Sequence, residues 1–103
     1  MNGYAYSNDY NQDNSAVESE LVRASQAMAV GNLRLVVEIA KGVLKIDENT
    51  PQAHYFIGRV TIETGQLDIA LKSLETAVEL DAYIAEYWGF LALVYSLTGD
   101  MVK

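Results

Sequence analysis

The chain contains no cysteine, one proline, one histidine and one tryptophan among its 103 residues. Without cysteine it has no disulfide framework and no thiolate chemistry, which fits a reducing compartment. A single histidine excludes a metal site made of several imidazoles, and a serine–histidine–acid triad would depend on His54 alone. We interpret His54 as a packed helix residue and expect no cofactor or metal.

Long hydrophobic runs are also missing. No segment approaches about eighteen consecutive apolar residues, the length that spans a bilayer as a helix. The N-terminus lacks a basic start followed by an apolar stretch, so we expect no secretory signal. The sequence therefore predicts a cytoplasmic protein without a membrane segment.

Basic residues are few, because seven Lys and Arg side chains stand against fourteen Asp and Glu, for a net charge of −7. The basic positions are scattered along the chain rather than clustered. Such a surface repels phosphate backbones, so we predict no nucleic-acid partner. The acidity favours a basic partner only weakly, since a negative surface also keeps a protein soluble.

Motifs that carry chemistry are absent as well. Glu75 and Glu79 have the spacing of a solvated helix stripe. Asp47 and Glu48 lack the alternating oxygen ligands and the turn glycine of a calcium loop. No glycine-rich phosphate motif occurs. We therefore predict no catalytic residue and no enzymatic activity.

Glycine, by contrast, recurs at a fixed interval. Gly31, Gly65 and Gly99 lie 34 residues apart, and each is followed by a polar residue and then a large apolar one. Small residues recur in another phase of the same period, at Ala24, Gly58 and Ala92. A recurrence of this kind predicts an array of structural repeats.

The residues between these glycines resemble the tetratricopeptide pattern W-x2-L-G-x2-Y, A-x3-F and P. The second copy has His54, Ile57, Gly58 and Thr61, then Ala70, Leu74 and Ala77. The third copy has Trp88, Leu91, Ala92 and Tyr95, and the first is degenerate, with Glu20, Arg23, Ala24 and Ala27. Glu48 and Ala82 replace the closing proline. The resemblance covers about Val17 to Lys103.

This resemblance implies an all-α fold, with antiparallel helical hairpins stacked as a short right-handed solenoid of about five helices. We expect a tetratricopeptide domain over 16–103, with repeats at about 17–50, 51–84 and an incomplete 85–103. Residues 1–15 have no helical period and are expected to form a disordered arm. This arm contains three tyrosines, Tyr4, Tyr6 and Tyr10. An alternative interpretation is therefore a short recognition segment whose tyrosines bind in a groove.

Helix boundaries follow from the turn residues. Each periodic glycine ends a helix in the left-handed conformation. Ser15 and Glu18 have capping-box spacing, and Pro51 suits a first helical position after Thr50. The predicted helices are 16–30, 33–46, 51–64, 67–80 and 83–97. The N-caps that follow the glycines are Asn32, Asp100 and the poorer Gln66, and Asp100 opens a sixth helix that has barely begun at Lys103.

The family resemblance implies that the first helix of each hairpin lines a concave groove. Side chains one turn from the packing stripe would point into it: Leu21, Ser25, Met28, Tyr55, Arg59, Ile62, Glu63, Gly89, Leu93 and Ser96. The set is mainly apolar with one cation, so a hydrophobic helix or extended segment is the expected ligand rather than a terminal carboxylate. Leu21, Met28, Ile62 and Leu93 equally suit the helix–helix core, whereas Tyr55 and Arg59 are types found at interface hot spots.

The last repeat lacks its second helix, which would leave Trp88, Leu91, Ala92 and Tyr95 without cover on one side. Three large side chains left half bare forfeit about 3 kcal/mol. Three covers are open: the rest of a longer chain, a second copy forming a homodimer through this helix, or the N-terminal arm.

Three functional hypotheses follow. The first is a protein–protein interaction module, an adaptor or scaffold that binds a protein or peptide segment in its groove and self-associates through its last helix. The second is the N-terminal repeat domain of a larger enzyme, because segments 85–88 and 96–99 look similar to the leading repeats of bacterial sulfotransferases. The third is a secretion-type chaperone, a class built from about three such repeats.

Overall fold

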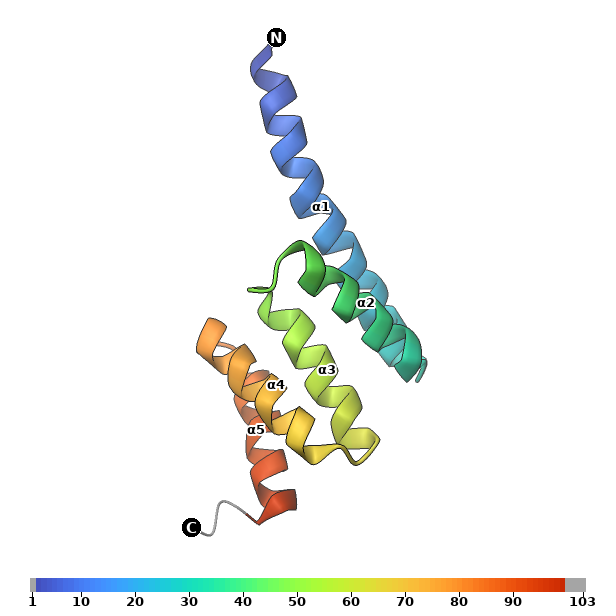
Figure 1. The fold of residues 1–103 in the computed structure, drawn as a ribbon, viewed down its shortest axis with the longest axis vertical. Coiled ribbons are helices and arrows are strands. Elements are labelled where there is room, and N and C mark those ends of the chain that lie inside the picture. The colour runs from blue at the N-terminus through green and yellow to red at the C-terminus, as the bar shows by residue number, and fades with distance from the viewer. Residues whose placement is uncertain (1, 100–103) are drawn as a thin grey trace.

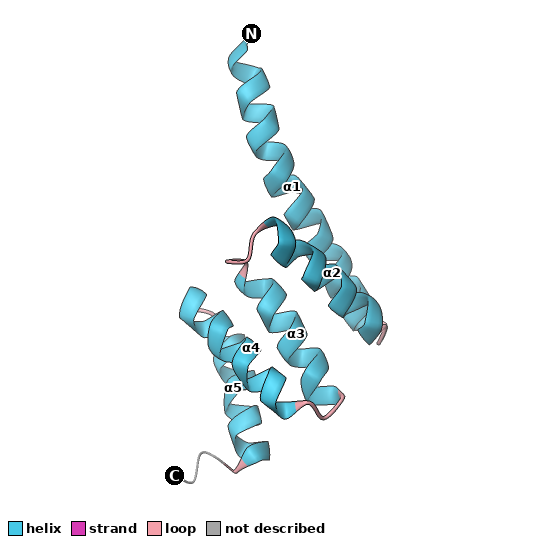
Figure 2. Cartoon of the chain, viewed as in Figure 1, coloured by secondary structure: helices cyan, strands magenta, loops and turns pink. Residues whose placement is uncertain are grey.

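The computed structural model describes residues 2–99, with side chains from Ser15 onward, and shows five α-helices joined by short turns (Figure 1, Figure 2). The helices are α1 (Asn2–Ala29), α2 (Leu33–Ile46), α3 (Pro51–Glu63), α4 (Leu67–Leu80) and α5 (Ala85–Thr98). They pack as sequential antiparallel pairs, as the repeat pattern predicts. The sixth helix expected from Asp100 lies outside the described residues.

The three periodic glycines end α1, α3 and α5 in the left-handed conformation, with φ values of 78° at Gly31, 81° at Gly65 and 79° at Gly99. The first two turns repeat the same hydrogen bonds. The amide of Asn32 donates to the carbonyl of Ala27 at 2.9 Å, and that of Gln66 donates to Thr61 at 2.8 Å. This six-to-one bond satisfies carbonyls that the helix end leaves open, so the period predicted the turn geometry correctly.

Helix starts differ in how well they are capped. The Asn32 side chain accepts a hydrogen bond from the amide of Leu35 at 3.3 Å, as an N-cap should. Gln66 makes no such bond. Pro51 lies at the start of α3 as predicted, but the Thr50 hydroxyl donates to the carbonyl of Asp47 instead of capping the helix.

The start of α1 differs from the sequence prediction. The helix begins at Asn2 instead of near Ala16, so Ser15 lies within it and forms no capping box. Extending a helix beyond a packed segment costs little once its first turns exist, because each added residue contributes one backbone hydrogen bond. The backbone of the expected arm is thus helical and projects past the other helices in Figure 1. The division into arm and repeat domain stays a prediction.

Small residues allow the helices of each pair to approach closely. Ala24 of α1 is fully buried under α2. A Cβ placed on Gly58 of α3 would lie 2.6 Å from Cγ of Leu74 in α4, closer than real Cβ atoms approach such a carbon. Leu74 itself is fully buried. The in-phase small residues of the first two repeats therefore mark the contact between the two helices of each hairpin.

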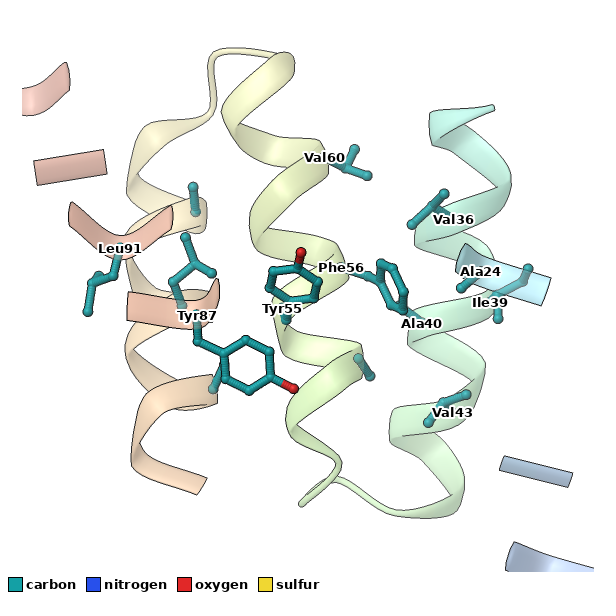
Figure 3. Packing of buried hydrophobic residues seen from close by; sticks show 14 of the residues in the cluster. Ala24, Val36, Ile39, Ala40, Val43, Tyr55, Phe56, Val60, Tyr87 and Leu91 are labelled. Atoms are coloured by element: carbon teal, nitrogen blue, oxygen red, sulfur yellow. The ribbon is translucent and has the colours of Figure 1, made fainter. Parts of the chain in front are cut away.

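The core is continuous because α3 carries apolar side chains on two sides. Figure 3 shows Phe56 pointing toward Val36 and Ala40 of α2, while Tyr55 points toward Tyr87 of α5. All five side chains are less than a tenth exposed. Helix α3 therefore connects the first hairpin to α5 and positions the surfaces described next.

Candidate protein-binding surfaces

The first helices of the repeats form a row. Helix α3 contacts both α1 and α5, whereas α2 and α4 do not contact each other within the described part of the chain. The exposed side of the row α1–α3–α5, called here the first-helix row, corresponds to the groove predicted from the sequence. The residues described next lie where α3 meets α5.

Tyr55 is not the free groove residue that the sequence suggested. Its side chain is 6% exposed. The ring centroid lies 5.0 Å from that of Tyr87 and 5.8 Å from that of Phe90, the latter edge-on. Both partners belong to the next repeat, so Tyr55 is used in packing α3 against α5 (Figure 3). Its role at the surface is to support a neighbour.

That neighbour is Arg59, one turn along α3 and half-buried. Its Nη1 donates to the Tyr55 hydroxyl at 3.3 Å. The guanidinium carbon lies 4.9 Å from the Phe90 ring centroid, within the range of a cation–π contact. Among residues 15–99 Arg59 forms no ion pair with a carboxylate. The structure thus holds a cation in place while leaving most of its donors for another group.

The phenol of Tyr55, beneath Arg59, and that of Tyr87, in contact with the Tyr55 ring, are neutral at ordinary pH. Burial raises the pKa of the Tyr55 phenol, and the hydrogen bond from Arg59 lowers it by a smaller amount. Burial also raises the pKa of Tyr87, followed by the negative charge of Asp81. Both hydroxyls therefore act as neutral hydrogen-bonding groups. The Arg59 guanidinium lies on an aromatic base, and the Glu86 carboxylate acts on the same Tyr55 hydroxyl.

The other predicted groove residues divide by exposure. Three are half-buried and pack against the core, as the alternative interpretation of them had it: Leu21, Met28 and Ile62. Five are exposed, namely Ser25, Glu63, Gly89, Leu93 and Ser96, with Leu93 at 41%. The structure brings Arg59 together with Tyr55. The half-buried residues belong to the packing between helices and are not free to contact a ligand with their whole side chains.

Shallow hollows lie elsewhere on the molecule. One of about 430 Å³ is bordered by His54, Ile69 and Lys72. Another of about 430 Å³ lies between α2 and the end of α3, beside Lys41 and Thr64. A third of about 400 Å³ borders the turn into α4. None of these three is lined by a predicted groove residue.

Phe90 is the surface residue that the sequence prediction missed. It lies 34 residues after Phe56, and that recurrence was a usable signal. Phe56 packs toward α2 and Phe90 toward Arg59 of α3, so in both repeats the same phase points an aromatic ring toward the preceding repeat. A search for aromatic residues at the repeat period would have found it.

Helix α5 carries the second surface. Trp88 is 48% exposed, and Ala92 and Ser96 on the same stripe are exposed as well. Tyr95 is half-buried, and its hydroxyl donates to Oε2 of Glu75 at 3.1 Å. Leu91 is only 4% exposed, so the expectation that it lacks cover is wrong. It faces inward because α3 and α4 together enclose that side of α5.

The single histidine makes a structural contact. His54 Nε2 lies 2.9 Å from the carbonyl oxygen of Glu48, which ties α3 to the preceding turn. Within residues 15–99 no three His, Cys, Asp or Glu side chains group in a way that would hold a metal ion. In the part of the chain that the structure covers, no helix combines the length and apolar character needed to cross a bilayer.

Comparisons with known proteins point to fold rather than to a named relative. No family model matches the chain. No curated protein matches it either. Among solved structures, a K341M mutant of the O-GlcNAc transferase of Thermobaculum terrenum is similar, with a TM-score of 0.79 and 26% identity, covering 81% of this chain and 16% of that one.

Two crystal structures of MamA are also similar. Both have 25% identity and cover 93% of this chain, with TM-scores of 0.74 and 0.73. The chain spans 56% and 52% of the MamA chains. In all three comparisons it therefore corresponds to less than two thirds of the matching protein.

Three lines now agree: the 34-residue period, the left-handed glycine turns and the likeness to these solved structures. Stacked hairpins of this kind generally serve protein interaction. The chain therefore has the fold of a short tetratricopeptide-repeat solenoid, similar to these solved structures.

Proposed function

We propose that this chain is a protein-interaction module, an adaptor or scaffold, that binds a protein segment along its first-helix row. The observation that carries the proposal is Arg59, held over Phe90 and bonded to Tyr55 without a carboxylate partner among residues 15–99. A cation fixed on an aromatic base, beside exposed Leu93 and Glu63, suits a mixed apolar and polar segment with an acceptor opposite Arg59. The proposal includes no catalytic role and places the module in the cytoplasm.

Replacement of Arg59 tests the groove. In an affinity capture from a lysate, Arg59→Ala should reduce recovery of the specific partners by about tenfold or more, the effect of a hot-spot arginine. Arg34→Ala is the matched control, because that side chain is 91% exposed and pairs only with Glu38. Equal recovery by both variants would place the binding site outside the first-helix row.

Attachment to a larger enzyme is a second candidate, favoured by the likeness to part of a transferase. In that arrangement the module would be the N-terminal repeat domain of the enzyme, as in the sulfotransferase-like arrangement considered from the sequence. The reading frame beyond Lys103 tests this, because an immediate stop codon contradicts it. A secretion-type chaperone is compatible with the same fold.

Self-association through the last helix, as a homodimer, is a further candidate for α5. Trp88 and Ala92 are exposed side by side on it. Light scattering across a concentration series tests it: a dimer has twice the monomer mass of 11.4 kDa, and a constant monomer mass contradicts it.

A further inference from the structure

The exposed stripe of α5 has counterparts in the first two repeats that are covered by a helix. Ala24 and Gly58 occupy the same phase as Ala92, and both are buried, the first under α2 and the second under Leu74 of α4. Ala92 is exposed. The position that a second helix covers in the first two repeats is therefore uncovered in the third repeat, within the described residues.

This surface, the α5 face, consists of Trp88, Gly89, Ala92, Leu93 and Ser96, which are all exposed. None of the five is charged. The Trp88 indole is held in place, because its Nε1 donates to the carbonyl of Ala82 at 2.7 Å. A fixed indole beside small residues leaves room for a close-packed helix and supplies a large apolar contact at one end.

Acidic side chains lie along α4, called here the acidic edge, and Glu75 among them contacts α5. Asp68, Lys72, Glu75 and Glu79 follow one another at helical spacing along α4, three carboxylates against one ammonium group. Glu75 marks the side on which the stripe lies, because it accepts the hydrogen bond from Tyr95 of α5. A helix on the α5 face would therefore bring its side chains near Glu75.

We propose that the α5 face binds an amphipathic helix of another protein that carries Lys or Arg along the edge facing α4. Charge complementarity selects this occupant, since a second copy of the chain would bring another acidic molecule with a net charge of −7. The inference does not depend on Arg59, although the α5 face lies on a helix of the first-helix row and shares Leu93 with the groove proposal.

The chain supplies two matched probes. A capped peptide of residues 33–46, the sequence of α2, carries three basic side chains against one acidic. A capped peptide of residues 67–80, the sequence of α4, carries one basic against three acidic. Each sequence covers a first helix in its own repeat. The two peptides have the same length and a similar spacing of apolar residues, and they differ in the sign of their net charge.

Trp88 is the only tryptophan of the chain, so its fluorescence reports cover of the α5 face directly. Titration of the full chain with the α2 peptide should shift the emission to shorter wavelength, with a dissociation constant that rises with salt. The α4 peptide should bind at least several-fold more weakly. Ala92→Glu places a charge on an exposed position of this face and should abolish the shift.

Removing carboxylates from α4 distinguishes electrostatic selection of the peptide from non-specific hydrophobic binding. Glu75→Gln with Glu79→Gln should weaken α2-peptide binding by roughly threefold to tenfold and reduce its salt dependence. Glu18→Gln with Glu38→Gln makes the same change in net charge on α1 and α2 and should have no such effect. Three results would overturn the proposal. The two peptides could bind equally well, or the Ala92→Glu variant could still bind the α2 peptide. The third is a dimeric protein whose Trp88 emission does not change when either peptide is added.

Discussion

Replacing Gly58 by alanine should destabilise the protein, although alanine is the better helix former. The added Cβ would lie 2.6 Å from Cγ of Leu74 and 3.0 Å from its Cδ2. Leu74 is fully buried, so its branched end has nowhere to retreat. Overpacking of this kind costs about 1–3 kcal/mol, and the gain in helix propensity offsets about 1 kcal/mol of it.

The matched substitution is Gly42→Ala on α2. Gly42 is also helical, but a Cβ there would meet nothing within 4 Å. This variant should gain roughly 0.5–1 kcal/mol from propensity alone. Urea unfolding followed by far-ultraviolet circular dichroism should therefore place the two alanine variants on opposite sides of wild type. Equal stabilisation by both would refute the close-approach argument.

A double substitution tests the cause. Leu74→Ala should cost about 2–5 kcal/mol by leaving a cavity, and it also removes the atoms that Gly58→Ala would meet. In that background Gly58→Ala should become neutral or stabilising, so the two substitutions should couple strongly. Additive effects would show that the cost at position 58 arises elsewhere than at Leu74.

Two other predictions concern local chemistry. Asn32→Ala should lower the free energy of unfolding by about 1 kcal/mol, because it removes the N-cap of α2. Gln66→Ala should have a smaller effect, since the Gln66 side chain does not cap α4. Thermal melts of the two variants test this, and equal losses of stability would contradict the role of Asn32 as a cap. Burial raises the pKa of the Tyr87 phenol in the folded protein above its ordinary value, so the phenol retains its proton in the folded protein at pH values where the unfolded chain has lost it. Stability should consequently fall as pH rises through that window, and Tyr87→Phe should flatten the decline in urea midpoints measured between pH 9 and 11; an unchanged slope would assign the loss to other groups.

Helix boundaries could be predicted because their signals are local. Gly31 and Gly65 end helices through backbone conformations that depend on one residue, and Pro51 fixes a helix start in the same way. The beginning of α1 could not be placed by such reasoning. No stop signal separates the polar segment from the packed one, and Ser15, which has the spacing of a cap, lies inside the helix.

The candidate surfaces were predicted less well, because exposure depends on neighbours more than on phase. The period places Tyr55 on the outer side of α3, but it carries no information on which rings of α5 reach that position. Tyr87 and Phe90 do reach it, so Tyr55 is buried. Leu91 was assigned to the bare side of α5 for the same reason. Arg59 survived as a surface candidate because its long side chain extends past the aromatic cluster.

Helix α3 has a consequence for cooperativity. Within the described chain, α1 contacts α2 and α3, and α5 contacts α3 and α4, but the two ends share no contact. In such a linear array stability is transmitted through neighbours, so any signal between the termini passes through the middle hairpin. Amide exchange should be slowest in α3, and a ligand that stabilises α5 should slow exchange in α3 and α4 first, reaching α1 only with attenuation.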